Sequence, residues 1–138
     1  MTLVNSVQSS EFSEEINSYK DLIVWQKSLV LIKSVYVSLR AFPREEVWGL
    51  TSQMKRSVVS VASNIAEGSS KRSTREFIRF LNISYGSLSE LEAQLIIAYE
   101  LEFLPKSNMI ALTESCNEIG KMLNGLVRSL NNKLNSEL

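Results

Sequence analysis

Histidine is absent from the 138-residue chain, and aspartate and cysteine occur once each, as Asp21 and Cys116. A zinc site of the usual kind needs several Cys or His ligands, and a di-iron site in a helical bundle needs paired Glu-x-x-His motifs. Neither set can be assembled from this sequence, which also contains no glycine-rich phosphate loop and no nucleophile elbow. We therefore expect no metal, no cofactor and no catalytic residue, and we interpret the chain as a non-enzymatic protein.

An excess of charge of one sign and long apolar runs are missing as well. The chain has 15 Lys and Arg residues against 15 Asp and Glu residues, so no global field draws it to nucleic acid, and any polyanion site must be local. Its longest apolar runs are about five residues, far below the roughly twenty that span a bilayer, and no signal peptide is recognisable. A single cysteine excludes an intrachain disulfide. These features predict a cytoplasmic protein with no membrane partner.

Glycine and proline are scarce, with five and two residues, and both Pro43 and Pro105 lie between segments with helical periodicity. So few breaks favour few, long helices. A length of 138 residues with 44% hydrophobic content suits one domain around one core. Because the three connections are short, we predict an all-α chain folded as an antiparallel up-down-up-down four-helix bundle.

Apolar spacings of three and four residues locate the predicted helices. The first is expected from Asp21 to Ala41, and the second from Arg44 or Glu45 to Gly68, which would take the C′ position. A capping box over 73–76 starts the third helix, whose regular core row has Ser84 as its single polar interruption. The fourth helix is expected over 108–130. The bundle thus covers 18–131, with a flexible tail at 1–17 and a frayed end at 132–138.

A polar stripe beside the core of the second helix is the most informative feature of the chain. It uses small or neutral side chains where a surface helix has long charged ones, and a matching set occurs on one face of the third helix. The residues of this polar seam are Gln53, Arg56, Ser57, Ser60, Asn64 and Glu67 on the second helix, and Ser87, Glu90 and Gln94 on the third.

Antiparallel pairing of these two helices brings Arg56 level with Glu90. We interpret the pair as a buried ion pair within a hydrogen-bond network that sets the helix register; a ligand or subunit contact is the alternative. Truncation of one partner, as in Glu90→Ala, would then destabilise the protein by about 3–5 kcal/mol. A carboxylate chemistry using Glu67 and Glu90 is also open, although a capping or packing role for Glu67 is simpler.

The third helix carries charges that oppose its own dipole. Its start is basic, with Lys71, Arg72, Arg75 and Arg79, and its far half is acidic, with Glu90, Glu92, Glu100 and Glu102. Three interpretations are open: a head-to-tail contact in a ring of subunits, phosphate binding at the basic start, or a solvated charged face.

Five aromatic residues could stack nucleic-acid bases if they were exposed: Trp25, Phe42, Trp48, Phe77 and Phe80. Aromatic residues at the ends of a bundle more often belong to the core or to an interface. We expect Trp48, which precedes Gly49, to cap one end of the bundle or to face a neighbouring subunit.

Several segments recur in order in a known family: 22–25, 42–46, 49–50, Gln53, 56–57, Ser60, 63–68, Phe77, 80–81 and 86–92. That family consists of the four-helix-bundle proteins encoded by intervening sequences in bacterial 23S ribosomal RNA genes. The chain resembles that family and, more distantly, the accessory variability proteins of diversity-generating retroelements. The family resemblance implies small helical subunits that assemble into homo-oligomeric rings, typically of five.

The role of that family is mostly unassigned, and its retroelement relatives are expected to be basic, from which this neutral chain departs. We therefore expect a homo-oligomer that presents an assembly or partner-binding surface. The alternative is an RNA- or DNA-binding accessory module that uses the basic start of the third helix.

Overall fold

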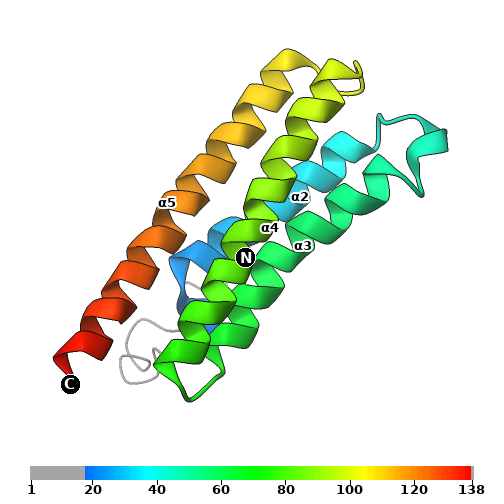
Figure 1. Ribbon diagram of the computed structural model, residues 1–138. Coiled ribbons are helices and arrows are strands. Elements are labelled where there is room, and N and C mark those ends of the chain that lie inside the picture. Colours follow the sequence, from blue (N-terminus) through cyan, green and yellow to red (C-terminus); the bar gives the residue numbers. More distant parts are fainter. Residues whose placement is uncertain (1–17, 138) are drawn as a thin grey trace.

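The computed structural model describes residues 18–137 (Figure 1). Within this range the chain is all-α, as predicted, and contains no strand. Two 3-10 turns and four long helices follow in order: η1 Tyr19–Asp21, α2 Ile23–Leu39, η2 Arg44–Glu46, α3 Leu50–Ser69, α4 Thr74–Glu100 and α5 Lys106–Ser136. The predicted tail at 1–17 lies outside the described residues.

Half of the capping box predicted at the start of α4 forms, since the Glu76 carboxylate binds Arg79 and no bond from the N–H of Ser73 to it is found among the described residues. The side-chain oxygen of Ser73 accepts a hydrogen bond from the backbone N–H of Glu76 at 3.2 Å, which satisfies an amide that has no partner within the helix. The start of α3 differs from the prediction by several residues. Residues 44–46 form a 3-10 turn, Gly49 leaves the helical path, and the Glu46 carboxylate accepts from the N–H of Leu50 at 3.0 Å. Glu46 thus caps α3 from outside the helix.

Gly68 does not take the predicted C′ position. It is a buried residue of the last turn of α3, no described glycine has a positive φ, and Ser70 caps the helix instead. A Cβ atom at Gly68 would lie 2.7 Å from the Cβ of Phe80 and 3.0 Å from Cδ1 of Phe77. The glycine is therefore required by the close approach of α3 and α4 and not by the backbone conformation of a turn.

α5 continues to Ser136, so the described part of the end that was expected to fray is helical. Leu126, Val127 and Leu130 pack against the core, and Leu134 is half-buried one turn further on. The apolar stripe of α5 therefore extends past the predicted boundary, and with it the helix.

Each long helix contributes side chains to one continuous core, including the fully buried Val35, Val58, Leu91 and Leu123. Figure 1 shows the four helices lying side by side. At one end, the ring of Phe42 lies 5.6 Å from that of Phe103, between the α2–α3 and α4–α5 connections. The α3–α4 connection lies at the opposite end with the last turns of α5 (Figure 1).

The contact at Gly68 predicts the effect of a single methyl group. Gly68→Ala should destabilise the protein by about 1–3 kcal/mol, because the backbone or a core phenylalanine must move, even though alanine is the better helix former. Gly125→Ala is the matched control, since a Cβ there meets nothing within 4 Å, and it should stabilise by about 0.5–1 kcal/mol. Urea unfolding measures both variants. Equal stability of Gly68→Ala and the wild type would contradict the proposed role of this glycine.

Candidate functional site

Small polar residues join α3 to α4 along part of the predicted polar seam. The hydroxyl oxygens of Ser60 and Ser87 lie 2.8 Å apart, across the two helices. The side-chain amide of Asn64 donates to the backbone carbonyl of Ser60 at 2.8 Å and to its hydroxyl oxygen at 2.9 Å. Ser57 is buried beside them, with 3% of its surface exposed. These residues form a neutral hydrogen-bonded strip between the helices.

Ser84 adds a second cross-helix bond that the seam prediction did not include. Its hydroxyl is fully buried and donates to the backbone carbonyl of Val61 at 2.8 Å. The signal was present in the sequence, because Ser84 interrupts an otherwise apolar core row. A small hydroxyl in such a row lets a partner helix approach and then bonds to its backbone.

The predicted buried pair of Arg56 and Glu90 is wrong. Both side chains are exposed, and no ion pair joins them among the described residues. Arg56 precedes the buried Ser57, and Glu90 precedes the buried Leu91. Because successive residues of a helix are rotated by about 100°, both charged side chains point outward. Water solvates the two charges there, which avoids the cost of desolvating an ion pair.

The remaining seam residues divide between the core and the surface. Gln53 and Glu67 are exposed. Gln94 is 5% exposed, and its side-chain oxygen accepts no hydrogen bond from any described residue. The seam is therefore narrower than predicted and contains no charge, which leaves no support here for a chemistry based on Glu67 and Glu90.

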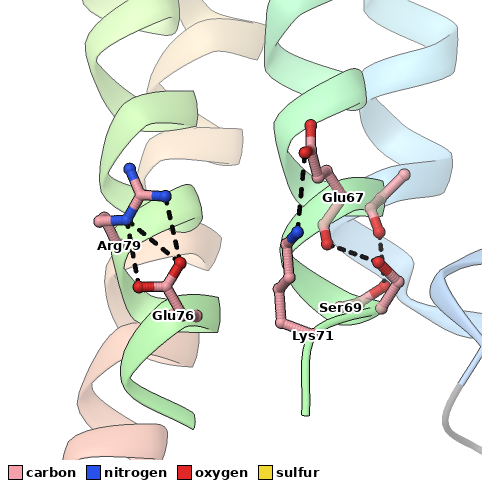
Figure 2. Close-up of polar contacts among 7 residues, drawn as sticks. Glu67, Ser69, Lys71, Glu76 and Arg79 are labelled. Atoms are coloured by element: carbon pink, nitrogen blue, oxygen red, sulfur yellow. Dashed lines mark hydrogen bonds and ion pairs between the residues drawn. The ribbon is translucent and has the colours of Figure 1, made fainter. Parts of the chain in front are cut away.

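The basic start of α4 is partly neutralised by neighbouring carboxylates (Figure 2). The guanidinium of Arg79 binds the Glu76 carboxylate, with Nη2 3.1 Å from Oε1, and this hydrogen bond lowers the pKa of Glu76 and raises that of Arg79. The ammonium nitrogen Nζ of Lys71 lies 3.9 Å from Oε2 of Glu67. Arg72 and Arg75 are exposed and form no ion pair with a described carboxylate. Of the four predicted cations, Lys71 and Arg79 are thus paired with carboxylates, and Arg72 and Arg75 are not paired with a described one.

Of the five aromatic residues considered above, only Trp48 is exposed. Phe42 and Phe80 are buried, and Trp25 and Phe77 are half-buried where they pack against the core, so none of the four is exposed as Trp48 is. Trp48 is 90% exposed, which rules out the predicted capping of the bundle end. Its alternative role, contact with a neighbouring subunit, stays a prediction. Glu100 ends α4 and Glu102 follows it with a φ of 65°, and both are exposed near the same end.

Residues 18–137 thus form a helical bundle with a neutral α3–α4 seam, and no charged side chain is among the residues that the structure describes as buried. A family model described as 23S rRNA-intervening sequence protein matches residues 20–125. The chain belongs to this family. The resemblance noted in the sequence is therefore confirmed, over most of the bundle.

A solved structure has the same fold as this chain. A protein of unknown function from the S23 ribosomal protein family of Bacteroides thetaiotaomicron superposes with a TM-score of 0.70. The two sequences are 24% identical, and the match covers 77% of this chain and 96% of the other. The curated proteins contain no match. These comparisons establish the family and the fold, and they assign no activity.

In this member of the 23S rRNA-intervening sequence protein family, the described residues hold no group of three or more His, Cys, Asp or Glu side chains that could bind a metal. None of its helices in that range has the length and apolar character needed to cross a bilayer. Cys116 is buried in the core, and burial raises the pKa of its thiol to about 12.

The seam predicts that removing a hydroxyl group from it lowers the free energy of unfolding more than removing the exposed charge of Glu90 does. Ser87→Ala should lower the free energy of unfolding by about 1 kcal/mol, because it breaks the bond to Ser60. Glu90→Ala should change it by less than about 0.5 kcal/mol, because that carboxylate is in water. Urea titrations of dilute protein compare the two. A larger loss of unfolding free energy in Glu90→Ala than in Ser87→Ala would instead support the buried ion pair of Glu90 with Arg56.

The burial of Cys116 predicts a protected thiol. At pH 8 the folded protein should react with a thiol reagent such as 5,5′-dithiobis(2-nitrobenzoate) only as it unfolds, because the thiol is both inaccessible and protonated. Since the folded pKa exceeds that of a free thiol, this group stabilises the fold fully below pH about 9 and progressively less as pH rises towards 12. Fast labelling in native buffer, at the rate seen in urea, would contradict this assignment.

Proposed function

We propose that this chain is a non-enzymatic helical-bundle protein that assembles with copies of itself into a closed ring, whose surface serves a partner. Three features support the proposal: the arrangement of the helices, an exposed tryptophan, and opposite charges at the two ends of α4.

The neighbour relations of the helices favour an antiparallel up-down-up-down bundle. Lys27 of α2 pairs with Glu118 of α5 at 3.1 Å, and Gly120 of α5 lies against Tyr85 and Leu88 of α4. α5 therefore neighbours both α2 and α4, while α3 packs on α2 and α4. Four helices joined by short connections in such a cycle are typical of this topology.

Trp48 is the observation that carries the proposal. It is a large aromatic side chain with 90% of its surface in water, on the connection before α3, and its neighbour Val47 is also exposed. Burial of a tryptophan between subunits is one of the most favourable contributions to an interface, because it removes a large apolar surface from water.

The charges at the two ends of the subunit suit a head-to-tail contact. Glu100 and Glu102 lie near the end that carries Trp48, whereas Arg72 and Arg75 lie at the other end of α4. If the acidic end of one copy meets the basic end of the next, the contact is heterologous and closes into a ring when the rotation per copy divides a full turn. The family resemblance favours five copies.

Nucleic-acid binding is the second candidate. Arg72 and Arg75 are exposed and unpaired with described carboxylates, and the family is named for an intervening sequence in 23S rRNA. The binding of Arg79 to Glu76 and the zero net charge weaken this alternative, because both reduce the positive field offered to a polyanion.

Solution mass tests the assembly. The protein should elute from light-scattering chromatography at about five times its 15.6 kDa subunit mass, and Trp48→Ser should shift it towards the monomer while leaving the helical circular dichroism unchanged. Val30→Ser is the control, since Val30 is 63% exposed on the side of α2. A wild-type monomer at micromolar concentration would refute the proposal, and loss of mass only in Val30→Ser would move the contact to α2.

Charge reversal tests the head-to-tail contact. Arg75→Glu and Glu100→Lys should each weaken assembly, and the double variant should recover it, because opposite charges face each other again. Failure of the double variant to recover would reject the pairing of these ends.

Salt dependence tests the second candidate. Binding to 23S rRNA fragments should fall steeply as salt rises and should weaken in Arg72→Ala and Arg75→Ala, but not in Lys106→Ala at the opposite end. Absence of binding at low salt would reject nucleic-acid recognition.

A further inference from the structure

A cavity of about 390 Å³ lies at the end of the bundle where α3 turns into α4. Its walls come from three parts of the chain that are distant in sequence: the start of α2, the α3–α4 connection and the last turns of α5. Three cationic side chains line it, Lys71 and Arg72 from the connection and Lys133 from α5. No carboxylate is among its described lining residues.

The concentration of positive charge in this cavity is unusual for a chain with zero net charge. Arg72 and Lys133 form no ion pair with a described carboxylate. The ammonium of Lys71 lies 3.9 Å from Oε2 of Glu67 and 5.3 Å from the centre of the Phe80 ring, and neither Glu67 nor Phe80 lines the cavity. Like charges around one concave site repel each other, and a bound anion relieves this repulsion. The hydroxyl of Thr74, which makes no hydrogen bond to a described residue, adds a neutral donor to the lining.

Three apolar residues, Leu22, Phe77 and Leu130, also line the cavity. Its volume lies within the range of small-molecule sites and exceeds the needs of a bare inorganic anion. A ligand that fits both kinds of lining residue has an anionic group of high charge and an organic part that covers the apolar side chains. Arg and Lys side chains bind phosphate through charge-assisted hydrogen bonds, and aromatic rings pack against planar organic groups.

We propose that this cavity binds a phosphate monoester, with the phosphate on Arg72 and Lys133 and the attached organic group against Phe77 and Leu130. One chain supplies all of the described lining. Arg72 also belongs to the basic end that the proposed ring places against the next copy, whereas Lys133 is not part of that contact, so the Lys133 variant tests the cavity separately from the ring. The organic group can belong to a small metabolite or to the 5′ end of an oligonucleotide, and the chemistry that recognises the phosphate is the same.

Isothermal titration of the full chain with adenosine 5′-monophosphate in low salt tests the proposal, with adenosine and inorganic phosphate as partial ligands. The monophosphate should bind, inorganic phosphate should bind more weakly, and adenosine should not bind measurably. Arg72→Gln and Lys133→Gln should each weaken binding about tenfold, because each removes a charge-assisted hydrogen bond. Lys106→Gln should bind as the wild type does, since it removes the same charge about 40 Å away along α5.

A 17-nucleotide RNA with and without a 5′-phosphate distinguishes the two sources of the ligand. Preference for the phosphorylated RNA over adenosine 5′-monophosphate assigns the site to nucleic-acid ends, and the reverse assigns it to a metabolite. Equal binding of adenosine and its monophosphate, or affinity unchanged in both Gln variants, would overturn the proposal. So would the absence of binding by every phosphate-bearing probe at millimolar concentration.

Discussion

The close packing of α3 against α4 is the constraint on which the rest of the structure depends. At Gly68 no side chain separates the two helices, and the backbone of α3 lies against Phe77 and Phe80. Further along, Ser84 bonds to the backbone of α3 and Ser60 bonds to Ser87. A slide of one helix past the other by a turn, about 5.4 Å, would break all of these contacts together.

Hydroxyl groups, and not the charged side chains of Arg56 and Glu90, connect α3 to α4 in this seam. The energies of the two kinds of contact explain why. A neutral hydrogen bond between two small side chains contributes about 1 kcal/mol, whereas burial of an ion pair costs several kcal/mol of desolvation before any attraction is gained. Arg56 and Glu90 lie one residue from the buried Ser57 and Leu91, and the backbone turns both charges into water. The register is therefore set by shape and hydroxyl bonds, and the charges lie on the surface, where water solvates them.

The register of α3 and α4 also decides what lies at each end of the bundle. It brings the α3–α4 connection, with Lys71 and Arg72, beside the last turns of α5, and it leaves Trp48 and Glu100 towards the other end. Lys133 lines the basic cavity because α5 continues past Leu130. The polar residues of this segment had predicted a frayed end. Packing of Leu130 and Leu134 extends this helix, a tertiary effect that outweighs the local preference of the polar residues between them.

Local spacing is enough to predict the all-α class, the core rows of the helices and the Ser73 cap of α4, because a single helix expresses each of them. Segments on α3 and α4 also indicate the family. The packing of the helices is needed to learn that Gly68 serves a close helix contact and that Arg56 and Glu90 do not meet. The same holds for the exposure of Trp48 and for the position of Lys133 beside the cavity that Arg72 lines. These outcomes depend on the distance and register between segments far apart in the chain, and helical periodicity specifies neither quantity.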